Sequence, residues 1–433
     1  MSLDFFKQPG ISLAEKFITY VARKKNAQCL QFFPTTSLSI PKRAGNVPTG
    51  LYIHVPFCEE LCPYCSFNRV EFQPGLAKRY FDALRKEILM YRDLGYNFKA
   101  LYVGGGTPTI SIEELASTIR LIRKTYGIIE ISVETNPNHL TKTNTSLLKD
   151  LGVDRLSVGV QTFDNDLLKS LKRHYKYGSG EEIKERLKQT QGIFHTLNVD
   201  MIFNFPTQTR AMLEKDLSTI ISLGVDQVTY YPLMSSTRTQ EIMSKELGGV
   251  VDYSRGREFY TVVTDALSSF YRASTAWCFS RHDAVIDEYA VNFDEYAGLG
   301  SGSIGHLGRS AYANTFDIES YIEKVNRGIL PITAKRDFTL QEMLSYDFLM
   351  KLFGLSLDID SLNAKHGVNT YHYLWQEILF FRLVRGLNKR GNRLLLTKRG
   401  RYYWFLMMRE FFIGVNNFRD YCREQIGGNR ETA

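Results

Sequence analysis

The chain has 433 residues, and its 54 Lys and Arg against 46 Asp and Glu give a formal net charge of +8. Because single hydrophobic cores stop growing near ~250–300 residues, this length predicts two or three domains. No uncharged apolar stretch reaches the ~18 residues that a membrane span needs, and the N-terminus lacks a secretory signal pattern, so we expect a cytoplasmic protein.

The basic excess is concentrated at the C-terminal end. From Arg382 onward the sequence holds twelve Lys and Arg against four Asp and Glu, interleaved with aromatic residues. This pattern suits an acidic substrate or an anionic membrane surface, although an amphipathic helix with extended arginines also explains it. Since no RNA-binding motif occurs, we expect no nucleic-acid partner. Peripheral contact with the inner membrane surface stays open.

Residues 1–49 form an N-terminal extension with one predicted helix at 13–25. Between residues 50 and 235, short β-rich runs alternate with stretches whose apolar residues have helical spacing. Six such repeats predict an α/β fold with a parallel sheet, either open or rolled into a partial (β/α)6 barrel. The working residues should then lie at the carboxyl ends of the strands. The six runs are 51–55, 100–104, 129–134, 154–160, 198–205 and 226–233.

The pattern changes after residue 235. Residues 236–335 hold predicted helices at 253–271 and 318–327 around a glycine-rich turn, Ala297 to Gly305, and we expect this segment to complete the barrel. Residues 336–433 are predicted to form a helical C-terminal domain. A short strand-like segment at 393–402 is compatible with a winged-helix-like arrangement.

Three of the six cysteines, Cys58, Cys62 and Cys65, form a C-x3-C-x2-C motif directly after the first run. Structural zinc usually takes four ligands in two separated pairs, and the cysteines at 29, 278 and 422 are isolated. A [4Fe–4S] cluster held by three thiolates instead leaves one iron open to a ligand from outside the protein. We therefore predict that these three thiolates bind a [4Fe–4S] cluster.

The motif resembles that of the radical S-adenosylmethionine (SAM) enzymes, in which the open iron binds the amino and carboxylate groups of SAM. Over residues 50–305 the flanking sequences resemble the group around oxygen-independent coproporphyrinogen III oxidase. The resemblance implies a partial radical SAM barrel and reductive cleavage of SAM to a 5′-deoxyadenosyl radical that abstracts a hydrogen atom. The matching sequences are YIHVPFC, YVGGGTPT, VETNP, RLSVGVQTF, NVDMIFNFP and GLGSGSIG.

The resemblance also assigns residues to SAM. Glycines after the second run let the backbone approach a ligand, and carboxylates end the third and fifth runs. On the first run, Tyr52 matches a position near the SAM sulfonium. His54 is either a catalytic residue at the substrate or a core histidine. The positions expected to bind the cofactor are Gly105, Gly106, Thr107, Glu134, Gln161, Arg173 and Asp200.

Two features favour one branch of this group. Coproporphyrinogen oxidases carry a further cysteine where this chain has Phe67, and haem chaperones carry an HN-x-x-YW motif where it has EYAVNFDEY, residues 288–296. Phe67 is compatible with the class C radical SAM methyltransferases, which use two SAM molecules to methylate flat aromatic rings. We therefore expect a C-methyltransferase whose second SAM lies near Phe67, residues 231–233, Ser303 and Ile304.

The aromatic, basic C-terminal half suggests a hydrophobic aromatic acceptor taken from a membrane surface, such as the naphthoquinone ring of menaquinone. The resemblance also implies an electron donor such as flavodoxin or ferredoxin. Two alternatives stay open. One is an oxidative porphyrinogen decarboxylase or another haem-processing oxidoreductase, and the other is a haem-binding chaperone that uses the barrel only as a scaffold.

Overall fold

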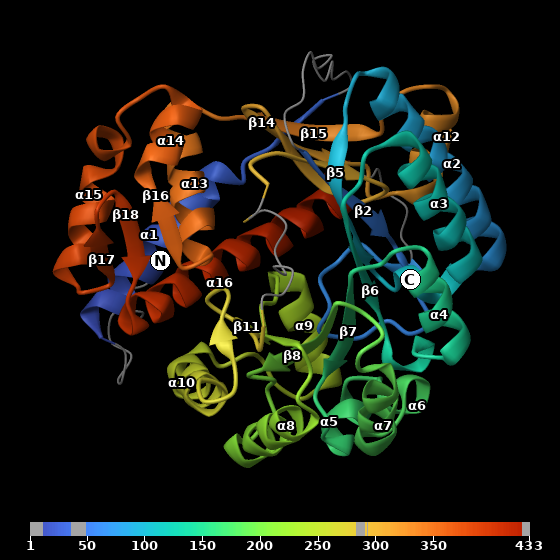
Figure 1. Ribbon diagram of the computed structural model, residues 1–433, viewed down its shortest axis with the longest axis horizontal. Helices are drawn as coiled ribbons and strands as arrows, with labels where there is room; N and C mark the ends of the chain where they lie inside the picture. The colour runs from blue at the N-terminus through green and yellow to red at the C-terminus, as the bar shows by residue number, and fades with distance from the viewer. Residues whose placement is uncertain (1–11, 36–48, 283–290, 292, 427–433) are drawn as a thin grey trace.

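The computed structural model describes residues 12–35, 49–282, 291 and 293–426. Within these residues, thirteen strands form one mixed sheet in the order β1-β15-β14-β13-β12-β2-β5-β6-β7-β8-β9-β11-β10. The neighbouring strands from β2 to β9 run parallel, with helices along the outer side of the sheet (Figure 1). These strands correspond to the six predicted runs, so the predicted α/β partial barrel is confirmed. They are β2 (Thr49–Val55), β5 (Phe98–Gly105), β6 (Glu130–Thr135), β7 (Arg155–Gln161), β8 (Thr196–Phe203) and β9 (Gln227–Pro232).

Burial explains these elements. β2 is buried at every position, as expected of a parallel strand covered on both faces. The helices between the strands are amphipathic; α3, for example, buries Leu115, Ile119 and Ile122. The helices that follow the strands in turn are α2 (Pro74–Asp93), α3 (Ile112–Thr125), α4 (Lys142–Asp150), α5 (Asn165–Ser170), α6 (His174–Tyr177), α7 (Gly180–Thr190) and α8 (Arg210–Leu223).

Residues 236–335 contain more strand than the sequence predicted. Besides α9 (Thr237–Glu246), α10 (Gly256–Leu267) and α12 (Ile318–Asn326), six short strands extend the sheet at both edges. The predicted glycine-rich turn is in fact the end of β12, a turn and the start of β13. A Cβ at Gly298 would lie 2.3 Å from the Ile304 carbonyl oxygen, so a close strand contact, not a turn, requires this glycine. The six strands are β10 (Arg272–Ala273), β11 (Cys278–Ser280), β12 (Tyr296–Leu299), β13 (Ile304–Leu307), β14 (Ser310–Asn314) and β15 (Ile332–Asp337).

The C-terminal region is helical around a small antiparallel sheet, β16-β18-β17. Its helix-strand-helix-helix-strand-strand order agrees with the predicted winged-helix-like arrangement. The predicted strand at 393–402 is too long, because Thr397 caps a helix that begins at Lys398. The elements are α13 (Leu340–Phe353), β16 (Ser356–Asp358), α14 (Ile359–His366), α15 (Thr370–Leu383), β17 (Leu387–Arg390), β18 (Arg393–Leu396) and α16 (Lys398–Tyr421).

Helix α16 connects this region to the barrel. It runs from the C-terminal elements into the middle of the molecule (Figure 1) and packs against α1 (Leu13–Cys29), the helix predicted at 13–25. Arg23 of α1 pairs with the buried Glu410 of α16 at 2.6 Å. The predicted domain boundaries stay a prediction, and residues 1–11 and 36–48 of the extension lie outside the described residues. Among the residues described, no helix has both the length and the apolarity to cross a membrane.

Candidate active site

The three clustered cysteines lie in a loop that follows β2. Cys58 ends β3 (Phe57–Cys58), which pairs in parallel with β4 (Val70–Glu71). Arg69 Nη2 donates to the carbonyl oxygens of Cys62 at 2.6 Å and Cys65 at 3.0 Å. One guanidinium therefore fixes the backbone between the second and third thiols. Arg69 was not among the predicted site residues, because its only signal in the sequence is its position four residues after Cys65.

Hydrogen-bond donors approach two of the thiols. Arg173 Nη1 lies 3.5 Å from Cys62 Sγ, and Thr107 Oγ1 lies 3.9 Å from Cys58 Sγ. Burial raises the pKa of Cys58 to about 12, and the neighbouring thiols of Cys65 and Cys62 add to this effect. The thiol therefore loses its proton only when iron replaces it.

The donor set fits a cluster better than a single ion. Within the described part of the chain, no three or more His, Cys, Asp or Glu side chains converge to hold one metal ion. A cluster needs no such convergence, because each thiolate binds a different iron. Cationic donors from Arg69 and Arg173 also suit a negatively charged iron–sulfur centre. The residues present therefore fit the predicted [4Fe–4S] cluster.

A glycine-rich segment after β5 lies against the first cysteine. The Gly106 N–H donates to Val55 O at 2.8 Å, and the Thr107 N–H donates to Phe57 O at 2.7 Å. A Cβ at Gly106 would lie 2.6 Å from Phe57 O and 2.9 Å from Cys58 Sγ. Only glycine leaves room for this approach.

Two carboxylates lie near the carboxyl ends of the strands. Glu134 accepts hydrogen bonds from Tyr102 OH at 2.8 Å and Gly105 N–H at 3.2 Å. Asp200 accepts from Ser157 Oγ at 2.7 Å. Glu134 is paired in register with Ser157, so the side chains of all three lie on one face of the sheet. Both carboxylates are half-buried, which leaves them accessible to a ligand.

Gln161 and Arg173 lie close to this edge. Gln161 ends β7 with φ of 74°, a conformation that non-glycine residues rarely adopt and that often marks a functional site. Arg173 is buried, donates to Asn136 Oδ1 at 2.9 Å and stacks over Tyr177 at 4.3 Å. Its Nε is buried and makes no hydrogen bond within the described part of the chain. The assignment of both residues to SAM stays a prediction.

His54 is occupied by neighbours on both sides. Its Nδ1 lies 2.9 Å from Tyr52 OH, and its Nε2 lies 2.7 Å from Asn68 O. Burial lowers the pKa of His54 to about 4, so the ring is neutral, donates from Nε2 to the carbonyl oxygen and accepts from the tyrosine at Nδ1. This geometry favours the core interpretation of His54 over a catalytic one.

The residues expected around a second SAM do not form one polar wall. Phe67 is 41% exposed, and the Arg419 guanidinium lies 4.4 Å from its ring centroid. The Ser303 hydroxyl is fully buried and donates to Gly300 O at 2.8 Å, within its own turn. Ile304 lines an apolar cavity beneath α16. Ser303 therefore stabilises the turn, and nothing in its contacts points to a ligand.

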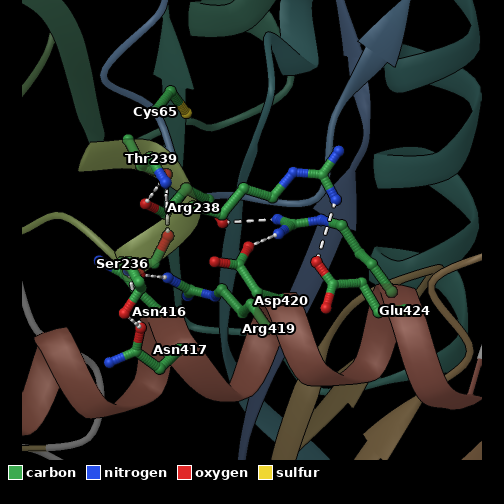
Figure 2. A network of polar contacts seen from close by, with 12 residues as sticks. Cys65, Ser236, Arg238, Thr239, Asn416, Asn417, Arg419, Asp420 and Glu424 are labelled. Carbon is green, nitrogen blue, oxygen red and sulfur yellow. Dashed lines mark hydrogen bonds and ion pairs between the residues drawn. The ribbon is translucent and has the colours of Figure 1, made fainter. Parts of the chain in front are cut away.

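The last helix closes over the turn after Cys65. Figure 2 shows Arg419 and Asp420 of α16 near Ser236 and Thr239 at the start of α9. Arg423, just past the end of α16, donates to Ser66 O at 2.6 Å and pairs with Asp420. The basic excess here is visible in the sequence, but its place in the fold is not, because the contact joins residues 357 positions apart.

Similarity to known proteins agrees with this architecture. Residues 52–220 match the sequence family described as the Radical SAM superfamily. The haem chaperone HemW of Bacillus subtilis is 29% identical over 320 residues, covering 70% of this chain and 82% of that protein. An oxygen-independent coproporphyrinogen III oxidase of Helicobacter pylori is 26% identical over 360 residues, covering 77% of this chain and 78% of that protein. The structure of coproporphyrinogen III oxidase (HemN) from Escherichia coli superposes with a TM-score of 0.74 at 22% identity, covering 88% of this chain and 95% of that protein.

Over residues 52–220 the chain is similar to the Radical SAM superfamily, and its fold is similar to that of the HemN structure. The proteins to which it is similar include haem chaperones and oxygen-independent coproporphyrinogen III oxidases. A [4Fe–4S] cluster and SAM are the cofactors of the superfamily, which confirms the predicted pair.

The methyltransferase interpretation is wrong. It rested on Phe67 and on the absence of the HN-x-x-YW motif at residues 288–296, a segment that lies partly outside the described residues. The similarity over 320–360 residues to a haem chaperone and a coproporphyrinogen III oxidase outweighs both features. The menaquinone acceptor followed from that interpretation and loses its basis with it, whereas the second SAM molecule stays a prediction.

Proposed function

We propose that the chain is a radical SAM oxidoreductase that acts on a carboxylate-bearing tetrapyrrole. The observation that carries the proposal is the similarity, along 70% or more of the chain, to both haem chaperones and coproporphyrinogen III oxidases. When bound, the cluster supplies the electron that cleaves SAM.

The chain's own residues divide the remaining work. Glu134 and Asp200, at the strand ends, are suited to the ammonium and hydroxyl groups of SAM. Arg419 and Arg423 bring cationic groups to the turn that follows the third cysteine. Arginine forks recognise carboxylates well, so this turn suits an acidic substrate.

The proposal is tested with the reconstituted, reduced protein under anaerobic conditions. We expect SAM and coproporphyrinogen III, with an added electron acceptor, to yield methionine, 5′-deoxyadenosine and a decarboxylated porphyrinogen. Cys62→Ala serves as the matched control and should form none of these. An intact porphyrinogen beside fully cleaved SAM would contradict the proposal.

A haem chaperone is the second candidate, because the match to HemW covers 82% of that protein. Transfer of bound haem to an apo-haemoprotein, without SAM consumption, would favour it over the oxidoreductase. A flavodoxin or ferredoxin as electron donor, a cytoplasmic location and contact with a membrane surface all stay predictions.

A further inference from the structure

An apolar cavity of about 500 Å³ lies beneath α16, separate from the strand edge that holds Glu134 and Asp200. Its walls come from α1, α13, α15, α16 and the strands β12 to β14. The volume lies within the ~300–1,000 Å³ range typical of small-molecule sites. Aromatic and aliphatic side chains dominate the lining, among them Phe17, Phe338, Phe348, Phe380, Met407 and Phe411.

A buried histidine in this lining has no hydrogen-bond partner among the residues that the structure describes. His306 of β13 is only 3% exposed, and neither of its ring nitrogens makes a hydrogen bond to any of these residues. The backbone of Asp294 lies near enough to raise the pKa of the imidazole, but the contact does not have hydrogen-bonding geometry. Leaving such a buried polar group unpaired destabilises the folded protein.

The surroundings of His306 are aromatic. The rings of Tyr346, Phe338 and Tyr296 lie 5.1, 6.0 and 6.3 Å from the imidazole, measured between centroids. Burial lowers the pKa of His306, so the ring is neutral and keeps a lone pair on one nitrogen. A neutral imidazole in an apolar cavity can accept a hydrogen bond or coordinate a metal ion.

The cavity extends towards the cysteine loop. Ile304 and Arg419 belong to its lining, and the Arg419 guanidinium lies 4.4 Å from the ring centroid of Phe67, two residues after Cys65. A molecule in the cavity could therefore direct a carboxylate to Arg419 while its apolar body contacts the aromatic walls.

We propose that this cavity binds the macrocycle of a tetrapyrrole, with the His306 imidazole facing the centre of the macrocycle. The choice of ligand class rests on the proposed function, whereas the site rests on the cavity and on the unpaired histidine. The imidazole would coordinate a central iron or accept a hydrogen bond from a pyrrole N–H, and the test distinguishes these two cases.

The test titrates the full-length protein with hemin and, separately, with iron-free protoporphyrin IX. His306→Ala should bind at least one of them ~10-fold more weakly, a change of about 1.4 kcal/mol. His372→Ala, at an exposed histidine of α15, is the matched control and should behave as wild type. Weaker binding of hemin alone indicates coordination, and weaker binding of both indicates the hydrogen bond. Unchanged binding of both would overturn the proposal.

A second measurement does not depend on the stability of the His306 variant. Trp404 and Trp277 pack against the cavity walls, with ring centroids 4.7 Å from Phe381 and 4.8 Å from Phe353. Trp375 is 55% exposed, so Trp375→Phe removes the surface signal. In that variant, one equivalent of protoporphyrin should quench the remaining tryptophan emission, and unquenched emission would count against the site.

Failure of the site and failure of the proposed function give different results. If His306→Ala converts porphyrinogen with the same KM as wild type, the site is refuted and the proposed function stands. Tight, His306-dependent binding with no conversion by the reduced, SAM-loaded protein would keep the site and refute the oxidoreductase.

Discussion

Replacing Gly106 with alanine should damage the cluster site directly. The new Cβ would lie 2.6 Å from the Phe57 carbonyl oxygen and 2.9 Å from Cys58 Sγ, both shorter than real Cβ contacts allow. The first partner is backbone, which cannot rotate away, and it belongs to the residue before the first ligand. The loop must therefore move by several tenths of an ångström, whereas iron–sulfur bond lengths tolerate only about 0.2 Å.

Overpacking of this kind costs about 1–3 kcal/mol, which corresponds to a roughly 5- to 150-fold change in an equilibrium constant. We expect Gly106→Ala to fold but to retain much less iron and sulfide after anaerobic reconstitution, measured by chemical analysis and visible absorption. Gly75→Ala is the matched control. Apart from its own chain neighbours and the nearby helix backbone, no described atom lies within 4 Å of the methyl group that this second substitution adds, and helix α2 should gain slightly in stability. Full cluster content in Gly106→Ala would refute the geometric reasoning.

Three further predictions concern the thiols, the carboxylates and a buried glutamate. Cys65→Ala should lose the brown absorption and all SAM cleavage, and an active protein with two thiols would refute the cluster assignment. Glu134→Ala and Asp200→Ala should keep the cluster but weaken SAM binding, as measured by equilibrium dialysis, and unchanged affinity in both would show that SAM binds elsewhere. Burial raises the pKa of Glu87 from 4.5 to about 7, so the stability that its protonated form provides is present below pH 4.5 and is lost as pH rises through 7. Between pH 4.5 and 7, the free energy of unfolding of the wild type should therefore fall by up to about 3 kcal/mol, whereas that of Glu87→Gln should not show this fall. Urea unfolding measures both, and parallel pH profiles would contradict the prediction.

The parallel part of the fold could be predicted because each strand is a continuous buried run before a helix of clear periodicity. The edge strands could not, since β10 to β14 have two to five residues each and carry no periodic pattern. Gly298 misled the prediction for a physical reason. Its missing side chain permits close strand packing, and sequence alone cannot distinguish that need from the need for a turn.

The candidate site shows the same division. Cys58, Cys62 and Cys65 are adjacent in sequence, so their spacing alone indicates their chemistry. Arg419 and His306 lie far from that motif along the chain, and their positions depend on how α16 and β13 pack. Phe67 shows the opposite error, because one residue in a motif was given more weight than similarity along the whole barrel.

The contact between Arg423 and Ser66 also has a consequence for biosynthesis. Its partners are 357 positions apart, so a ribosome adding ~5–20 residues per second completes the cysteine loop roughly 20–70 s before it makes the arginine that covers it. During that interval the nascent chain presents its thiols uncovered. The order of synthesis thus gives iron delivery access to the loop before the last helix closes it.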